Sequence, residues 1–459
     1  MNLQVGVSRE TRPTNVRYQV LGWACALSML TYIDRVCIKQ VEPEMSRDLN
    51  LTEQQFGWIF GAFGLAYALF EIPSGWLGDK FGPRLVLCRI VIWWSAFTAL
   101  TGLVPLFAWD LGWFALNSVV ALVLVRFLFG AGEAGAYPNI ARALRNWFPY
   151  RRRGIAQGML WAFGRWGGAI APFLIAQASA TAFGWRGAFV IFGVFGVFWV
   201  AAFAVFFRNH PDEHAKVNDA ERAYIRGSAP ESVKPPPMSW RATLASPTIW
   251  FLSLMYFCSN AGWCFFITWD VRYYQSVLGL EGTALRIASG APLFFGGIAC
   301  LAGGFITDWM VRVLGRRWGR TAQGAVAYFC GGFFFTAALL LSDFPWLSVA
   351  CLCMASFLKD FAMAASWSTC IDIGHRYSGT VAGFMNGVGN MGTFVSPPII
   401  AWLAIPAEIG GPTRWDLALV YSAGMFFVAS MGWLFINPKR VIVYAPADHE
   451  RLLAEGAIQ

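Results

Sequence analysis

The chain has 459 residues, of which 57% are hydrophobic and only 13% are charged. Because about a quarter of the residues of an ordinary soluble protein are charged, this composition excludes a soluble domain and indicates a membrane protein in contact with a lipid bilayer. The net charge of +9 does not predict a nucleic-acid partner, because no basic patch interleaved with aromatic residues stands on a soluble module.

Twelve apolar runs along the chain are long enough to cross a bilayer as helices. They lie near residues 20–38, 57–76, 85–106, 115–138, 155–179, 187–207, 249–270, 287–308, 321–341, 346–371, 380–404 and 415–436. Backbone groups in lipid must find hydrogen-bond partners within their own segment, so every run is predicted to be helical. The expected fold is an all-α membrane protein of about twelve transmembrane helices.

The longest polar stretch, about residues 208–246, carries Pro230, Pro235, Pro236 and Pro237 and divides the apolar runs six and six. Five segments are therefore expected. They are an N-terminal segment (1–19), a first six-helix half (20–207), a linker (208–246), a second six-helix half (247–437) and a C-terminal tail (438–459). Basic residues concentrate on alternate loops, which predicts that both termini and the linker are cytoplasmic. The compact loops suit a bacterial inner membrane.

The two halves carry similar motifs at matching places. After the second run the sequence reads GWLGDKFGPR (Gly75–Arg84), and after the eighth run it reads GGFITDWMVRVLGRRWGR (Gly303–Arg320). A short basic loop also opens both the fifth and the eleventh runs, and both runs are rich in glycine. A duplicated six-helix unit is typical of transporters whose two halves are related by pseudo-symmetry.

The motif Gly75-x-Leu77-x-Asp79-x-x-Gly82-x-Arg84 resembles the signature loop of the major facilitator superfamily, and the six-plus-six layout extends this resemblance over the whole chain. Three further segments resemble its anion:cation symporter family, which includes bacterial sugar-acid permeases and the vesicular glutamate and sialic acid transporters. They are YIDR in the first run, Arg126-x-x-x-Gly130-x-Gly132-Glu133 in the fourth, and NGVGNMG (Asn386–Gly392) in the eleventh. The resemblance implies proton-coupled uptake of an organic anion, often a hexonate or hexuronate.

Ionisable residues inside the apolar runs are the candidate functional residues. Each costs about 2.5–3.5 kcal/mol at the centre of a membrane helix, so it normally faces the bundle interior and has a partner. Arg126 and Glu133 are seven residues apart, close to two helical turns, and share one helix face. A cation near an acid suits a site where anion binding and proton binding influence each other.

Asp34 and Arg35 are about 100° apart on their helix and point in different directions. In the resembling family, the positions that match Arg35 and Arg126 are associated with anion binding, and those that match Asp34 and Glu133 with proton coupling. The alternative is that Asp34 and Arg35 are ordinary charges at a helix end. Arg165 is expected either to contact the anion or to neutralise Glu133.

The remaining candidates have less specific signals. Tyr273, Tyr274, Asn386 and Asn390 are expected to donate hydrogen bonds to substrate hydroxyls, with a structural role as the alternative. Asp79, Arg84 and Asp308 are expected to act in gating, with a static loop brace as the alternative. Glu71 is expected to form an ion pair with the fourth or eleventh helix, and roles for Lys359 and Asp360 stay open. Asp270 and Arg272 depart from the uncharged segment usual in the family, which leaves the substrate range open.

We therefore predict proton-coupled symport of an organic anion by alternating access. The alternative is an antiporter of organic anions or organic phosphates without proton coupling, in which the membrane acids would be dispensable. A membrane enzyme is not expected, because the four histidines lie outside the depths of the apolar runs and form no metal-binding or general-base motif. No cofactor and no metal are expected. The ten cysteines form no CxxC pair, and we expect a monomer.

Overall fold

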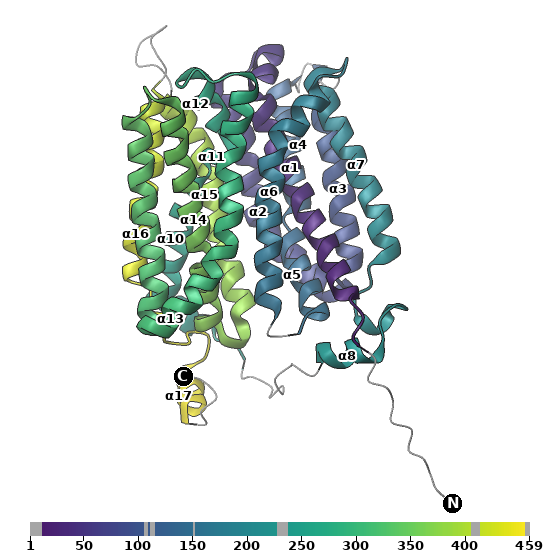
Figure 1. Cartoon of the computed structure of the whole chain (residues 1–459), viewed down its shortest axis with the longest axis vertical. Coiled ribbons are helices and arrows are strands. Elements are labelled where there is room, and N and C mark those ends of the chain that lie inside the picture. The colour runs from purple at the N-terminus through teal and green to yellow at the C-terminus, as the bar shows by residue number, and fades with distance from the viewer. Residues whose placement is uncertain are drawn as a thin grey trace, which may run out of the picture.

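The computed structural model describes residues 12–104, 109–110, 115–149, 152–226, 237–404 and 414–454. Two helix bundles stand side by side (Figure 1), one coloured purple to teal and the other green to yellow. The first contains α1 (Val16–Leu49), α2 (Glu53–Phe81), α3 (Pro83–Leu103), α4 (Ser118–Glu133), α5 (Ala136–Trp147), α6 (Arg153–Ser179) and α7 (Gly184–Phe206). The second contains α10 (Pro247–Trp263), α11 (Phe265–Thr268), α12 (Asp270–Ser276), α13 (Gly282–Leu340), α14 (Pro345–Gly374), α15 (Ser378–Ala404) and α16 (Trp415–Leu434).

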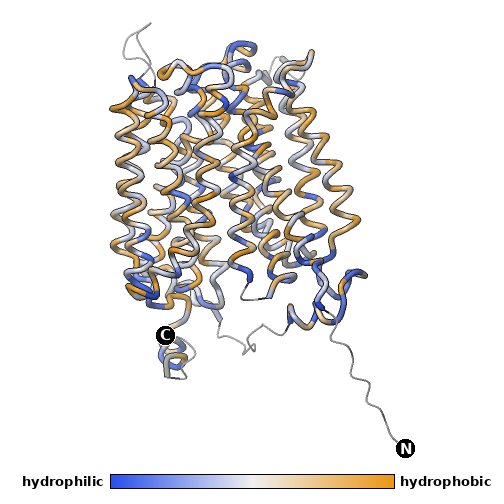
Figure 2. Tube along the Cα trace, viewed as in Figure 1, coloured by the Kyte–Doolittle hydropathy of each residue, from blue (hydrophilic) through white to orange (hydrophobic). Residues whose placement is uncertain are grey.

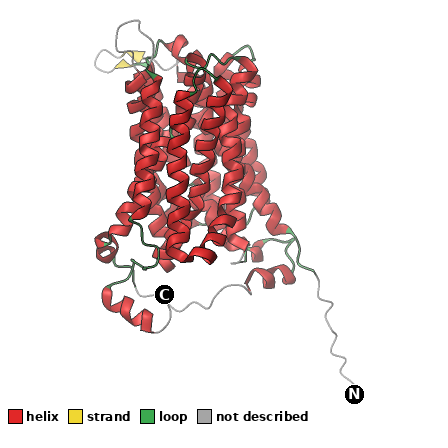
Figure 3. Cartoon of the chain, turned by 60° about the vertical axis from the view of Figure 1, so that its left-hand side comes forward, coloured by secondary structure: helices red, strands yellow, loops and turns green. Residues whose placement is uncertain are grey.

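Short elements lie at the two ends of the bundles. The antiparallel strands β1 (Trp109–Asp110) and β2 (Ala115–Leu116) lie at one end, drawn in yellow in Figure 3. The other elements are η3 (Pro211–Glu213), α8 (Asp219–Arg226), α9 (Trp240–Ala245), η4 (His375–Tyr377) and α17 (Pro446–Ala454). Helices α8 and α17 lie at the opposite end from the strands. We call this the linker end, and the other the far end.

The prediction of an all-α fold with twelve spans in two halves is confirmed. Nine described helices are long and apolar enough to cross a membrane when α4 and α5 are taken as one. One of them, α13, comprises two spans, because the backbone leaves the helical conformation at Gly315 (φ 74°, ψ 167°), which glycine adopts readily. The seventh span is divided into α10, α11 and α12, and α15 forms the eleventh.

The first span extends well beyond the apolar run that predicts it. Helix α1 continues to Leu49 and ends at Asn50, which has a left-handed backbone conformation and is one of the few residue types that accept it easily. Thr52 then starts α2 with a reciprocal capping box to Gln55. The polar residues of the extension include Lys39 and Glu42, which are buried, so the hydropathy of the segment underestimates the length of the helix.

Hydrophobic residues predominate along the helices of both bundles, drawn in orange in Figure 2. Many large apolar side chains among the described residues are exposed on the outside of these helices. Large examples are Phe195 and Phe198 on α7 and Phe329 and Phe333 on α13, which are 58–70% exposed. Such a surface would be costly in water, but it is the surface expected for helices that face lipid tails.

Close packing of α2 on α15 brings the two halves together. A Cβ atom added to Gly61 of α2 would lie 2.7 Å from the carbonyl oxygen of Phe394, and one added to Gly64 would lie 2.7 Å from the Phe394 backbone nitrogen. The glycines therefore allow direct contact between backbones, as small residues do between membrane helices. A second contact between the halves joins α6 to α13.

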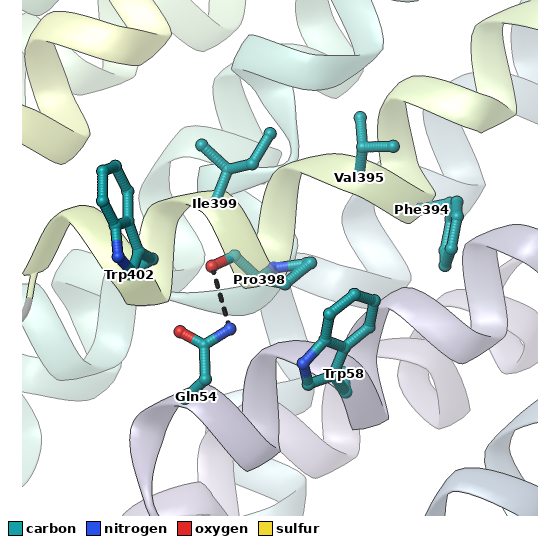
Figure 4. A pocket seen from close by; sticks show the side chains of 7 residues that line it. All are labelled: Gln54, Trp58, Phe394, Val395, Pro398, Ile399 and Trp402. Carbon is teal, nitrogen blue, oxygen red and sulfur yellow. Dashed lines mark hydrogen bonds between the residues drawn. The ribbon is translucent and has the colours of Figure 1, made fainter.

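A shallow pocket of about 330 Å³ opens beside the α2–α15 contact (Figure 4). Seven residues line it: Gln54, Trp58, Phe394, Val395, Pro398, Ile399 and Trp402. The Gln54 Nε2 donates a hydrogen bond to the carbonyl oxygen of Pro398 at 3.4 Å across this pocket. Because none of the buried charged residues lines this pocket, it is not the candidate functional site.

The described part of the linker is anchored to the first half. The Arg17 guanidinium at the start of α1 forms an ion pair with Glu221 of α8 at 2.9 Å, and His214 packs against the rings of Trp147 and Phe206. Burial, together with neighbouring basic side chains, lowers the pKa of His214, which favours the neutral ring at pH 7. Residues 1–11, 227–236 and 455–459 of the predicted terminal and linker segments lie outside the described residues.

The close approach of α2 to α15 predicts that Gly61→Val destabilises the protein by about 1–3 kcal/mol, because the new side chain overlaps the Phe394 backbone. The measurement is the midpoint of thermal unfolding in detergent. Gly22→Val on α1 is the matched control, since no atom lies within 4 Å of a Cβ added there. Equal midpoints for the two variants would contradict the proposed contact.

Candidate functional site

The first of two buried charge clusters joins α1 to α4. Arg35 of α1 donates from Nε to Oε1 of Glu133 at 3.0 Å and also from Nη2 to the same oxygen. Its guanidinium carbon lies about 5 Å from the ring centres of Tyr32, Phe63 and Tyr67. Glu133, which ends α4 and is 0% exposed, is therefore paired with Arg35 rather than with Arg126 or Arg165.

Arg126 and Asp34 lie beside this pair without ion-pair partners among the described residues. Arg126 is 3% exposed. Its guanidinium carbon lies 4.5 Å from the Phe129 ring centre and 5.3 Å from that of Phe63, and its Nε has no hydrogen-bond partner. Neither oxygen of the buried Asp34 accepts a hydrogen bond of normal geometry, although Arg126, Glu133 and the Trp94 indole are its polar neighbours. A buried cation without a counter-ion is costly and well placed to bind an anion.

The second cluster crosses from the first half to the second. Arg165 of α6 makes a two-pronged ion pair with Asp360 of α14, with Nε to Oδ2 at 2.6 Å and Nη2 to Oδ1 at 2.8 Å. Its third nitrogen donates to the Tyr32 hydroxyl. Lys359 also contacts Asp360, with Nζ 3.2 Å from Oδ1. Of the two roles expected for Arg165, neutralisation of Glu133 is therefore not seen.

A third group of charges links the halves nearer the far end. The Lys39 ammonium of α1 contacts both carboxylate oxygens of Asp270 in α12, at 2.8 and 2.9 Å, and the carbonyl oxygen of Phe266 at 2.6 Å. Lys39 is 1% and Asp270 0% exposed. Two residues further along, Arg272 lies 3.2 Å from Glu42. Asp270 and Arg272, which depart from the uncharged family pattern, are thus paired with Lys39 and Glu42 of α1.

Sequence reasoning did not include Lys39 and Glu42 among the candidate residues. They follow the first apolar run and read as ordinary loop charges. A signal was nevertheless available in the charge pattern. Lys39 and Glu42 are three residues apart, so a base and an acid share one face of the first helix. The seventh span carries the complementary acid and base, Asp270 and Arg272.

The carboxylate of Glu71 in α2 binds the amides of α15. Nδ2 of Asn386 donates to both Glu71 oxygens, at 2.5 and 2.7 Å, and Nδ2 of Asn390 lies 3.4 Å from Oε2. Glu71 thus contacts the eleventh span as expected, but through amide hydrogen bonds instead of an ion pair. In this structure, Asn386 and Asn390, which were expected to bind substrate hydroxyls, bind Glu71 of the other half.

The remaining candidates lie apart from both charge clusters. The Tyr273 hydroxyl lies 3.5 Å from that of Ser348, and the Tyr274 hydroxyl has no partner among the described residues. At the linker end, the backbone N–H of Arg84 donates to Oδ1 of Asn209 at 2.9 Å, and its guanidinium donates to the carbonyl oxygen of Ala204. Asp308 is exposed on α13, and the side chain of Asp79 lies outside the described residues.

Comparisons with known proteins identify relatives along nearly the whole chain. The family profile of the Major Facilitator Superfamily matches residues 24–397. The probable sulfoacetate transporter of Cupriavidus necator is 32% identical over 92% of this chain and 94% of the relative. The hexuronate transporter of Bacillus subtilis is 26% identical over 92% of this chain and 94% of the relative. The probable galactarate/D-glucarate transporter of the same organism is 25% identical over 94% of each chain.

Solved structures have the same fold. A bacterial homologue of the human lysosomal transporter Spinster, in an inward-facing and unoccupied conformation, superposes with a TM-score of 0.66. The two chains are 20% identical, and the match covers 92% of this chain and 95% of that one.

The buried Lys39–Asp270 pair predicts a non-additive effect on stability. Lys39→Met or Asp270→Asn alone should destabilise the protein by about 3–5 kcal/mol, since each leaves one buried charge unpaired. The double variant should unfold at a higher temperature than either single variant, because no unpaired charge remains. Thermal unfolding of all four proteins in detergent measures this coupling, and strictly additive shifts would argue against the pair.

Proposed function

Because the chain belongs to the Major Facilitator Superfamily, whose members are transporters and not enzymes, we propose that it is a secondary active transporter that couples uptake of an organic anion to protons. The proposed substrates are sugar acids or other small carboxylates and sulfonates. The relatives support this class, since they are named as transporters of sulfoacetate, hexuronate and galactarate/D-glucarate. Alternating access of the two halves would carry the anion across the bilayer.

The observation that carries the proposal is the buried, uncompensated guanidinium of Arg126. Its neighbours are aromatic rings and the acids Asp34 and Glu133. Glu133 is paired with Arg35, and Arg126 forms no ion pair with any described residue. A substrate carboxylate or sulfonate would supply the missing counter-charge and two acceptor oxygens for the guanidinium fork. Arg35, which shares the Phe63 ring with Arg126, would provide the second anion contact.

Proton coupling follows from the competition for Arg35. Glu133 holds Arg35 while its carboxylate is ionised, so a proton on Glu133 would release the guanidinium for the substrate. Asp34, which accepts no hydrogen bond of normal geometry, is the second proposed proton carrier. Binding of an anion and of protons would then favour each other, as reciprocal linkage requires.

The linker end, where α8 and α17 lie, is proposed to be cytoplasmic in a bacterial inner membrane, with both termini on that side. The contacts Lys39–Asp270 and Glu42–Arg272 would then close the external side between the halves. Opening to the outside would require these ion pairs to separate. Arg84, Asp79 and Asp308 stay proposed gating residues of the cytoplasmic side.

Arg126→Ala should weaken binding of a transported acid by about two orders of magnitude, because the variant loses two charge-assisted hydrogen bonds. Binding to the purified protein is measured by calorimetry with sulfoacetate, galactarate and a hexuronate. Arg186→Ala is the control, since Arg186 forms a partly exposed ion pair with Asp48 and its removal should leave affinity unchanged. Retained affinity in Arg126→Ala would refute the anion site.

Glu133→Gln should abolish uphill accumulation driven by an inward proton gradient while leaving exchange of labelled for unlabelled anion. The amide cannot carry the coupling proton, but it has a similar shape. Proteoliposomes with and without preloaded anion separate the two activities. Accumulation at the wild-type rate would overturn the coupling role, and uptake by the wild type only into preloaded vesicles would favour the antiporter.

A further inference from the structure

Four cations and three aromatic rings alternate in one continuous row, in which Arg126, Arg165 and Lys359 are buried and Arg35 is partly buried. Arg126 and Arg35 both contact the Phe63 ring, and Arg35 and Arg165 both contact the Tyr32 ring. The order along the row is Arg126, Phe63, Arg35, Tyr32, Arg165, Trp263 and Lys359. The row begins on α4 of the first half and ends on α14 of the second.

The two inner cations of this row are neutralised, and the two outer cations are not. Arg35 is paired with Glu133, and Arg165 makes a two-pronged pair with Asp360. Asp360 is also the only described acid that contacts Lys359, so one carboxylate is shared by two cations and one positive charge is left over. At the other end, Arg126 has no ion-pair partner among the described residues, and its acidic neighbours are Asp34 and Glu133. Once both acids carry the protons proposed above, Arg126 is uncompensated and Arg35 is released beside it.

Hydrogen-bond donors without acceptors also lie around Lys359. The ammonium donates one hydrogen bond, to Asp360 at 3.2 Å, and has three N–H groups. It lies 4.4 Å from the centre of the Trp263 ring, and the Nε1 of this ring has no partner among the described residues although Trp263 is 5% exposed. Buried donors that lack an acceptor are costly, and an acid group would satisfy them.

We propose that the transported substrate is a dianion with one acid group at each end. Arg126 would bind one acid group and Lys359, with the Trp263 indole N–H, the other. This inference rests on the proposed function and specifies its substrate class. Arg126 lies on α4 and Lys359 on α14, so a dianion bound by both would contact both halves.

The dianion follows from charge balance. A monoanion on Arg126 would leave the excess charge at Lys359 unneutralised in a region of low dielectric constant, where an isolated charge is costly. The names of the relatives include both classes, since sulfoacetate and galactarate carry two acid groups and a hexuronate carries one. The family alone therefore does not select between them.

The test compares matched acids on the purified, full-length protein. The probes are galactarate against galactonate and sulfoacetate against acetate, with affinity measured by calorimetry and by the shift in unfolding midpoint. The wild type should bind at least one dianion about tenfold or more tightly than its matched monoanion. Lys359→Gln should lose this preference by weakening only the dianion, and Lys359→Arg should keep it.

Trp263→Phe provides a second variant, since it keeps an aromatic ring at this position and removes the indole N–H together with the five-membered ring that carries it. It should weaken the dianion and leave the monoanion unchanged. Each unliganded variant is first shown to unfold at the wild-type midpoint, which is expected because the Arg165–Asp360 pair is untouched.

Three results would overturn the proposal. They are equal affinities of the wild type for matched dianion and monoanion, an unchanged preference in Lys359→Gln, and an equal loss of both affinities in that variant. If one of these results is obtained and Arg126→Ala also loses binding, the proposed function is supported but the dianion proposal is refuted. If no probe binds, or if Arg126→Ala binds normally, the proposed function fails and the dianion assignment fails with it.

Discussion

The cost of placing a charge in a membrane protein's interior governs the organisation of this molecule. Every buried acid except Asp34 has a base or an amide as partner among the described residues, and several of these partners belong to the opposite half. Arg165–Asp360 and Lys39–Asp270 therefore join the halves, and Arg35–Glu133 joins two helices of one half. The few charges left over, Arg126 above all, are the groups that a substrate would complete.

The same contacts give alternating access a physical basis. The halves meet through glycine-mediated backbone packing of α2 on α15 and through ion pairs. Such contacts have two discrete states, made or broken, and so permit a switch between conformations instead of a gradual deformation. An anion that supplies charge to both halves would change the balance between these states, which is the differential interaction that any ligand-driven transition needs.

Much of the fold could be predicted from the sequence, because twelve apolar runs and a motif repeated in both halves allow few other architectures. The depth of Arg126, Glu133 and Arg165 could also be predicted. The partners could not, since helical spacing gives a shared face but not the rotation of one helix against another. Glu133 was therefore expected to act with Arg126, whereas the structure pairs it with Arg35. The burial of Lys39 could not be predicted, because this residue lies in the polar end of its helix, beyond the apolar run.

Binding of a substrate anion to Arg126 is the step on which the proposed transport depends. An experimental structure of the protein with bound galactarate or sulfoacetate tests it. We expect an acid oxygen about 2.7–3.0 Å from the Arg126 guanidinium nitrogens. An anion bound elsewhere, with Arg126 still lacking a counter-ion, would contradict it.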